Sequence, residues 1–213
     1  MIVRFRGEKN GLNVGNKLSI VLNDVGEGGN MQPENIDLAW VWSKLQSGIK
    51  SNKNDYHLMQ LSYVALNQFP KTSTVVLRQL SNRHVYFHTD YRSEKIKALQ
   101  ASSKVCLHWY SLEEKVQIVF QASAKIHHLD EVCQEKWSNM RALSKECYHQ
   151  LGVPKEDYKP ELATFDISSE AAFNNFSVVA CEIHHMDVLL LRLKDNIRFV
   201  LSENDQAFRR VMA

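Results

Sequence analysis

The stretch of residues 72–110 decides the fold class of this 213-residue chain. It reads TSTVVLRQL over residues 72–80, HVYFHTDYRSEKIKALQ over 84–100 and KVCLHWY over 104–110. Short runs of β-branched and aromatic residues predict strands, and residues 74–80 and 84–89 form a predicted hairpin around Ser81-Asn82-Arg83. Helical spacing predicts a short helix from Ser93 to Gln100, and a third strand follows.

A cluster of hydroxyl and cationic side chains follows the second of these strands. Thr89 and Asp90 end the strand, and Arg92, Ser93 and Lys95 stand where the helix begins. Backbone N–H groups at the start of a helix attract anions, and neighbouring cations strengthen the attraction. The sequence therefore favours a phosphate-binding corner. The alternative is an ordinary helix N-cap beside a solvated, charged helix.

The remainder of the chain is also rich in predicted strands. One helix is expected to start within residues 33–37 and to end near Gly48 or Lys50, and a second is expected over 130–151. Strands are expected over 56–66, 115–127, 176–183, 188–193, 197–201 and 208–212. The strand over 115–127 is long enough to bend, and residues 121–123 are the predicted place. The chain lacks an alternating βα rhythm, which disfavours a Rossmann fold. This number of strands, with antiparallel hairpins and a few flanking helices, predicts a mainly β (α+β) fold with a closed or nearly closed antiparallel barrel.

The first 32 residues differ from the rest in composition. They hold six of the eight glycines and lack a sustained hydrophobic period. Met31 stands close to the point where the pattern of helices and strands begins. We therefore expect a flexible N-terminal extension over residues 1–32 and one domain over residues 33–213.

Composition excludes several classes of partner. The chain has 26 basic and 24 acidic residues, a net charge of +2 that gives no reason to expect nucleic acid. It has no apolar run of membrane-spanning length, and its N-terminus lacks the apolar part of a signal peptide. We expect a cytoplasmic protein with no membrane partner. The four cysteines lie far apart without a C-x-x-C motif, which favours buried thiols over metal ligands.

The quoted motifs resemble the FMN-binding split barrel of the pyridoxamine 5'-phosphate oxidase-like proteins. TSTVVLR, YFHTDYRSEK, KVCLHWY and a later β-run follow the family's order, and the resemblance spans residues 36–212. It implies a homodimer that binds FMN at its interface. It also implies an oxidoreductase that transfers hydride or electrons between the flavin and a small-molecule substrate. The substrate, the electron acceptor and the catalytic residues are not implied.

The resemblance also implies a set of cofactor-binding residues. Arg78 matches the cation that closes the Val-Val-Leu strand, and Thr89, Ser93 and Lys95 match the phosphate turn. The full expected set is Arg78, His88, Thr89, Arg92, Ser93, Lys95 and Lys115. No metal site is expected, because the pairs His127-His128 and His184-His185 are adjacent strand residues that point to opposite faces.

Three positions depart from the family's pattern. Ser73 stands where an arginine is usual, Glu94 where many members have an arginine, and Lys115 where a glutamine is usual. Each lost charge-assisted bond costs roughly 1.5–3 kcal/mol. An alternative is therefore a non-catalytic split-barrel protein with lost or weakened flavin binding. The segment CYHQLGVPKEDY also lacks the arginines of true pyridoxamine-phosphate oxidases, which argues against vitamin B6 oxidation.

Overall fold

The computed structural model describes residues 36–150, 152–154, 157, 169–192 and 195–213. The predicted extension over residues 1–32 lies outside the described residues. The helices are α1 (Leu38–Lys50), α2 (Glu94–Ala101), α3 (Glu131–Ser138), α4 (Ala142–Lys145), the 3-10 helix η1 (Glu146–Tyr148) and α5 (Ser169–Asn175). The strands are β1 (Leu58–Val64), β2 (Pro70–Val76), β3 (Gln79–Ser81), β4 (His84–Asp90), β5 (Lys104–Ser111), β6 (Val116–His127), β7 (Phe176–Leu190), β8 (Ile197–Ser202) and β9 (Arg209–Val211).

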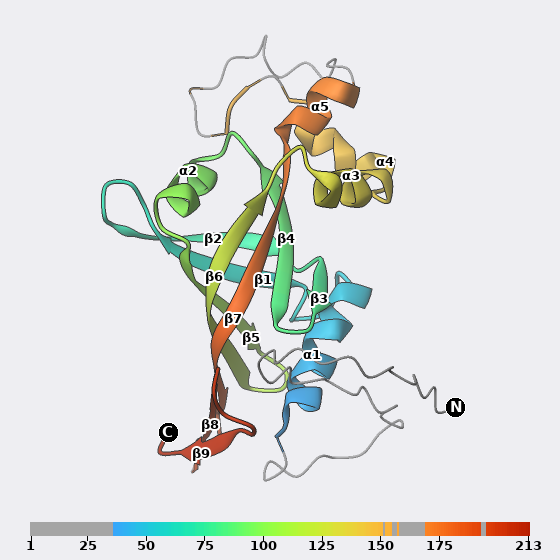
Figure 1. Cartoon of the computed structure of the whole chain (residues 1–213). Coiled ribbons are helices and arrows are strands. Elements are labelled where there is room, and N and C mark those ends of the chain that lie inside the picture. Colours follow the sequence, from blue (N-terminus) through green and yellow to red (C-terminus); the bar gives the residue numbers. More distant parts are fainter. Residues whose placement is uncertain (1–35, 151, 155–156, 158–168, 193–194) are drawn as a thin grey trace, which may run out of the picture.

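The described strands form one curled antiparallel sheet (Figure 1). Its order is β2-β1-β5-β6-β7-β4-β3, with β8 and β9 added beside β7. The two ends of this order, β2 and β3, are consecutive in the chain, and only Leu77 and Arg78 separate them. The Leu77 N–H donates to the His57 carbonyl, and the Arg78 N–H donates to the Tyr86 carbonyl. The sheet therefore curls until its two ends meet, which makes it a barrel.

The barrel splits where β7 changes its partner. One edge of β7 pairs with β6, whereas the other edge pairs with β4 up to Glu182 and with β8 from His185 onward. The β6–β7 register shifts between Gln121 and Ala122, which leaves His184 as the extra residue of a bulge. A bulge bends the strand that carries its extra residue, which here is β7, opposite Gln121 and Ala122 of β6. The bend predicted at residues 121–123 of β6 itself stays a prediction. The split β-barrel with flanking helices, expected from the family resemblance, is confirmed.

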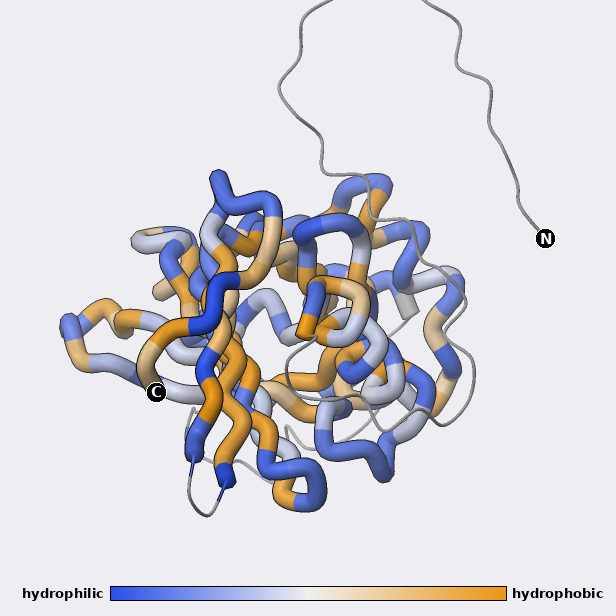
Figure 2. The backbone as a smooth tube through the Cα atoms, turned by 90° about the horizontal axis from the view of Figure 1, so that it is seen from below, coloured by the Kyte–Doolittle hydropathy of each residue, from blue (hydrophilic) through white to orange (hydrophobic). Residues whose placement is uncertain are grey.

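The barrel interior is filled by aliphatic and aromatic side chains from the strands and from α1. Asp37 caps α1, because its side chain accepts a hydrogen bond of 2.8 Å from the Trp40 N–H. Val41, Trp42 and Leu45 of α1 are buried in this core. Hydrophobic residues run along the strands, and hydrophilic residues gather at hairpin tips and on the outer turns (Figure 2).

A second, smaller apolar cluster covers the outer face of β4 and β7. Its buried members, which we call the outer cluster, are Cys133, Tyr148, Ala172, Phe176 and Val178. They come from α3, η1, α5 and the first residues of β7. Figure 1 shows α3, α4 and α5 together at one end of the barrel. One face of β4 therefore meets the barrel core, and the other face meets the outer cluster.

The structure corrects three predicted elements. The predicted strand over 74–80 is two strands, because β2 pairs with β1 and only β3 pairs with β4. The predicted helix over 130–151 ends at Ser138, and its remainder forms α4 and η1. The two strands predicted over 176–183 and 188–193 are one continuous strand, β7, which bends at the bulge instead of breaking.

The cysteine prediction holds in part. All four thiols are free, and Cys133 and Cys181 are buried. Cys106 is half-buried, however, and Cys147 is exposed on η1, where it donates to the Ser144 carbonyl.

Candidate functional site

The turn from β4 into α2 brings hydroxyl and ammonium groups together. Thr89 points toward the barrel interior and is buried, and its Oγ1 lies 3.0 Å from Lys95 Nζ. The buried Ser177 hydroxyl donates to the Thr89 carbonyl at 2.8 Å and fixes the end of β4. We call the group Thr89, Ser93 and Lys95 the β4–α2 corner. The structure confirms that these three predicted residues lie at one strand-to-helix junction.

Within this corner, the Ser93 hydroxyl is the group whose hydrogen bonding is not satisfied among the described residues. Ser93 is the N-cap of α2, and only 3% of its surface is exposed. Its hydroxyl makes no capping bond to the helix, and its Oγ has no hydrogen-bond partner in the part of the chain that the structure describes. A buried hydroxyl without a partner costs free energy. An anion bound at the start of the helix would supply the missing acceptor.

Two ion pairs surround the corner. Asp90 accepts from the Arg92 backbone N–H at 2.8 Å, and its carboxylate pairs with the Arg92 guanidinium at 2.6 Å. Glu94, in the first turn of α2, pairs with Lys71 of β2. Three cations, Lys71, Arg92 and Lys95, and two carboxylates, Asp90 and Glu94, are thus gathered at or beside the corner. The net charge of these five side chains remains positive, although Glu94 stands where many family members have an arginine.

Lys71 is a residue that the sequence interpretation missed. It lies on the same face of β2 as Ser73, two residues further on, because side chains alternate along a strand. Ser73 is the position where the family pattern has an arginine, and its hydroxyl meets the Tyr63 hydroxyl at 3.4 Å. A shift of two residues along the strand therefore places a cation beside α2. The alternation of side chains along residues 71–75 of the sequence could have indicated that Lys71 and Ser73 share a face of the strand.

His88 faces away from the corner. Its ring packs edge-on against Phe176 of the outer cluster, with the centroids 5.0 Å apart. Burial lowers the pKa of His88 to about 3, and the positive charges of Arg78 and Lys136 contribute. The imidazole is therefore neutral near pH 7 and offers no charge to a phosphate. Its neighbour Thr89 points to the opposite face.

Arg78 lies in the two-residue link between β2 and β3. Its side chain is exposed, and its charge acts on His88 and on Tyr148 of the outer cluster. Arg78 therefore lies toward the outer face of β4, whereas Thr89 points inward. The structure brings Arg78 near β4 but shows no contact between it and the β4–α2 corner in the described residues.

Lys115 lies at the opposite end of the barrel from the corner. Asp90 pairs with the first residue of β7, whereas Val116, next to Lys115, pairs with the last. Lys115 is exposed and has a φ of 57°, a left-handed conformation in the β5–β6 turn. Within one chain, the structure does not bring Lys115 to the β4–α2 corner.

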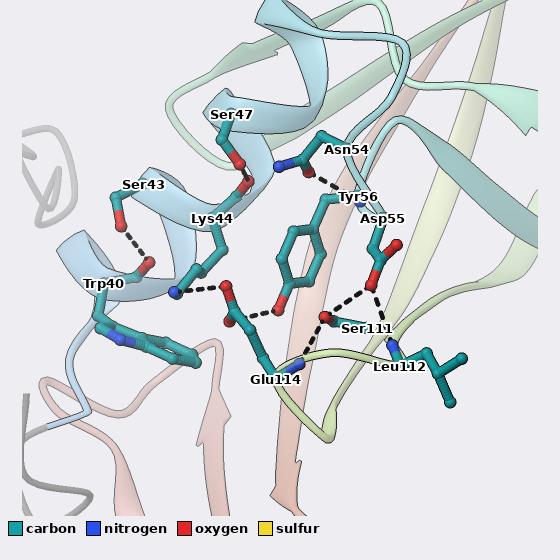
Figure 3. A network of polar contacts seen from close by, with 10 residues as sticks. All are labelled: Trp40, Ser43, Lys44, Ser47, Asn54, Asp55, Tyr56, Ser111, Leu112 and Glu114. Atoms are coloured by element: carbon teal, nitrogen blue, oxygen red, sulfur yellow. Dashed lines mark hydrogen bonds and ion pairs between the residues drawn. The ribbon is translucent and has the colours of Figure 1, made fainter. Parts of the chain in front are cut away.

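A polar network fixes the β5–β6 turn that carries Lys115 (Figure 3). Glu114 accepts from the Tyr56 hydroxyl at 3.0 Å and pairs with Lys44 of α1 at 2.8 Å. Asp55 accepts from the Ser111 hydroxyl at 2.8 Å and from the next backbone N–H at 3.0 Å. Burial, followed by the Glu114 charge, raises the pKa of Tyr56. The turn is therefore tied to α1 and to the loop before β1.

A pocket of about 360 Å³ adjoins the turn between β4 and α2. Tyr91, next to Arg92, stacks on the His128 ring with centroids 3.4 Å apart. The lining residues are Tyr91, Arg92, Ile96, Lys97, Gln100 and Val153. Two of the six carry positive charge, so this side of α2 also suits an anionic ligand.

Comparison with known proteins identifies a matching family. The family described as "Pyridoxamine 5'-phosphate oxidase, FMN-binding domain" matches residues 39–128. A pyridoxine/pyridoxamine 5'-phosphate oxidase of Flavobacterium johnsoniae is 34% identical over 71 residues, 33% of each chain. A second such oxidase, from Hydrogenovibrio crunogenus, is 42% identical over 71 residues, 32% of this chain and 33% of its own. These two matches span one third of the relatives' length. The Agrobacterium fabrum oxidase is 23% identical over 189 residues, 84% of this chain and 92% of its own.

Two solved structures have the same fold. A pyridoxamine 5'-phosphate oxidase-related, FMN binding protein from Nostoc punctiforme gives a TM-score of 0.67 at 19% identity, covering 87% of this chain and 99% of its own. PhzG from Burkholderia lata, solved in complex with tetrahydrophenazine-1-carboxylic acid, gives 0.68 at 12% identity, covering 88% and 99%. At these identities the likeness concerns the fold alone.

In the portion of the chain covered by the structure, no helix has both the length and the apolar character needed to cross a membrane.

Proposed function

Because the chain belongs to the pyridoxamine 5'-phosphate oxidase-like split-barrel family, we propose that it is an FMN-binding oxidoreductase acting on a small-molecule substrate. The observation that carries the proposal is the Ser93 hydroxyl at the start of α2, which is buried and has no hydrogen-bond partner among the described residues. At the same junction the Lys95 ammonium donates to the Thr89 hydroxyl at 3.0 Å. The donors of the corner fit a dianionic phosphate, because charge-assisted bonds to hydroxyl and ammonium groups are the strong ones.

Thr89, Ser93 and Lys95 would hold the FMN phosphate, and Arg92 would add a further positive charge at the turn. The Ser93 hydroxyl would donate a hydrogen bond to a phosphate oxygen. The start of α2 would contribute the positive end of the helix dipole. Lys71 would keep the Glu94 carboxylate paired and so reduce its repulsion of the phosphate.

When bound, the flavin supplies the hydride and electron transfer itself. The roles of the chain are to bind and orient the cofactor and to shape the space beside it. The positively charged pocket next to Tyr91 is a candidate site for part of the ligand or for an anionic substrate. The absence of the family's arginine-rich segment supports a substrate other than vitamin B6 phosphates.

The proposed active form is a cytoplasmic homodimer. Lys115 is at the far end of β7 from the corner, and the network around Glu114 holds its turn in place. In a dimer that pairs opposite ends of the two barrels, Lys115 of one protomer would approach the corner of its partner. Lys115 and Arg78 would then complete a flavin site that one chain leaves incomplete.

The second candidate is a split-barrel protein that has lost flavin binding and acts as a binding module. The carboxylates of Asp90 and Glu94, both close to the Ser93 hydroxyl in sequence, favour this alternative. The two candidates predict different colours for the purified protein. An FMN-binding protein carries, or takes up on titration, the visible absorbance of oxidised flavin. A protein without flavin stays colourless and leaves the fluorescence of added FMN unquenched.

A further inference from the structure

Three polar side chains line up where β7 leaves β4 for β8. His184 Nε2 lies 2.8 Å from Ser123 Oγ, and His184 Nδ1 lies 3.2 Å from Glu203 Oε2. Ser123 is on β6, His184 is the extra residue of the β7 bulge, and Glu203 follows the end of β8. Side chains from β6, from the β7 bulge and from the turn after β8 thus form a serine–histidine–carboxylate chain.

The hydrogen-bonding capacity of these groups fixes the direction of the protons. An ionised carboxylate only accepts hydrogen bonds, so the N–H at His184 Nδ1 donates a hydrogen bond to the Glu203 carboxylate. In a neutral imidazole the other nitrogen is then an acceptor, so the Ser123 hydroxyl donates to His184 Nε2. A serine hydroxyl that donates to a histidine, itself oriented by a carboxylate, is the arrangement that activates a serine nucleophile.

Neighbouring contacts hold the glutamate in place. The Arg83 guanidinium, at the β3–β4 turn, donates to the Glu203 carbonyl at 3.2 Å and to the Ile183 carbonyl at 3.1 Å. Asp205 accepts from the Ser202 N–H at 2.9 Å and closes the turn after β8. The backbones of Glu203 and of the β7 bulge are thereby fixed relative to one another.

The triad is accessible to solvent. The exposed fraction is 37% for the His184 side chain and 61% for the Glu203 side chain, and Ser123 is half-buried. The β5–β6 register places Lys104 directly opposite Ser123, on the same face of the sheet. Lys104 is exposed, so its ammonium is available to a negative charge that develops beside the serine.

We propose that Ser123, His184 and Glu203 form a nucleophilic site that hydrolyses small, unhindered acyl esters. Ser123 Oγ attacks the carbonyl carbon while its proton passes to His184 Nε2. The adduct expels the alcohol, which takes that proton and leaves an acyl-Ser123 ester. Water, deprotonated by the same nitrogen, then attacks the ester, releases the carboxylic acid and returns the proton to Ser123. The site shares no residue with the β4–α2 corner, so the proposal does not depend on flavin binding.

The test uses the full chain with p-nitrophenyl acetate as substrate and a fluorophosphonate as an active-site label. We expect hydrolysis above that of buffer, and labelling at Ser123 located by peptide mass spectrometry. Ser123→Ala is expected to abolish the labelling, and His184→Gln to lower both rates at least tenfold. His185→Gln, the adjacent histidine, is the matched control and should retain both rates. Glu203 acts through His184, so Glu203→Asp should recover activity that Glu203→Gln loses.

Circular dichroism and thermal melts of each variant separate loss of chemistry from loss of fold. Ser123→Cys gives a second arm, because a thiol at this position keeps a nucleophile and should react with p-nitrophenyl acetate. Equal labelling of wild type and Ser123→Ala, or hydrolysis no faster than buffer in folded wild type, would overturn the proposal. Either result would mean that the three side chains only brace the bulge.

Discussion

Lys71 on β2 forms an ion pair with Glu94 in the first turn of α2. The two residues are far apart in sequence, and the pair crosses from the β1–β2 hairpin to the helix that begins at Ser93. Glu94 is a carboxylate at a position where a phosphate is expected to bind. The pair explains how the chain tolerates this carboxylate, since Lys71 neutralises it.

Replacing Glu94 should therefore tighten flavin binding. Glu94→Arg removes a repulsive charge, adds a cation and releases Lys71 toward the phosphate. We expect the FMN dissociation constant to fall about tenfold, equivalent to about 1.4 kcal/mol. Fluorescence quenching titration measures it, with Glu94→Gln as the intermediate control. The ion pair is partly exposed, so its loss should change the free energy of unfolding by no more than about 1 kcal/mol. An unchanged or higher FMN dissociation constant in Glu94→Arg would place Glu94 away from the phosphate.

Ser93→Ala should separate binding from stability. The Ser93 hydroxyl is buried without a partner in the described part of the chain, so its removal should leave the stability of the free protein unchanged or raise it by about 1 kcal/mol. FMN affinity should fall at least fivefold, because a bond to a charged phosphate is lost. Urea unfolding of the free protein and FMN titration give the two values. A destabilised free protein with unchanged FMN affinity would assign the hydroxyl a purely structural role.

His88 should make stability depend on pH. Its pKa is lowered from 6.5 to about 3, so the folded state keeps the ring neutral while the unfolded state gains a proton. The stabilisation is complete above pH 6.5 and is lost as the pH falls toward 3, at up to about 1.4 kcal/mol per pH unit. His88→Gln should flatten this slope between pH 6.5 and 5 in urea unfolding. A wild-type slope equal to that of the variant would contradict the burial of a neutral His88.

Tyr56 should make the β5–β6 turn sensitive to high pH. Its raised pKa means that the folded state holds the hydroxyl proton more tightly than the unfolded chain, whose tyrosine titrates near 10.0. Stability is therefore complete below pH 10 and lost as the pH rises further. Tyr56→Phe should cost about 1–2 kcal/mol at pH 7, because Glu114 loses a buried donor. The variant should also lose less stability than wild type between pH 9 and 10.5. Equal losses in wild type and variant would contradict a Tyr56 hydroxyl whose pKa is raised by burial and by the Glu114 charge.

The family resemblance implied the split barrel, and the sequence itself predicted the hairpin around Ser81-Asn82-Arg83 and the turn from Thr89 to Lys95. These features depend on local patterns: alternation in strands, a turn tripeptide and a cap residue before a helix. No such pattern marks the break between β2 and β3, because the two residues that separate them, Leu77 and Arg78, include neither glycine nor proline. The break follows instead from closure of the barrel, which is a property of the whole sheet.

The site shows the same division. Thr89, Ser93 and Lys95 are close in sequence, so local reasoning brought them together. The resemblance implies His88 as a further cofactor-binding residue, but its side chain packs against Phe176 of the outer cluster, on the face opposite to Thr89. Lys71 was missed because its contact with Glu94 depends on the pairing of β1 with β2. The link between Ser123, His184 and Glu203 likewise depends on a bulge and on the strand order.

The most direct measurement of the central claim compares FMN with riboflavin, which lacks the phosphate. The dissociation constants of both are measured by fluorescence titration for the wild type and for Lys95→Ala, with Lys97→Ala, on the same helix, as the control. If Lys95 and Ser93 hold the phosphate, Lys95→Ala should weaken FMN binding by at least tenfold, or about 1.4 kcal/mol, and leave riboflavin binding within twofold. Equal losses for the two ligands, or no FMN binding by the wild type, would contradict the account.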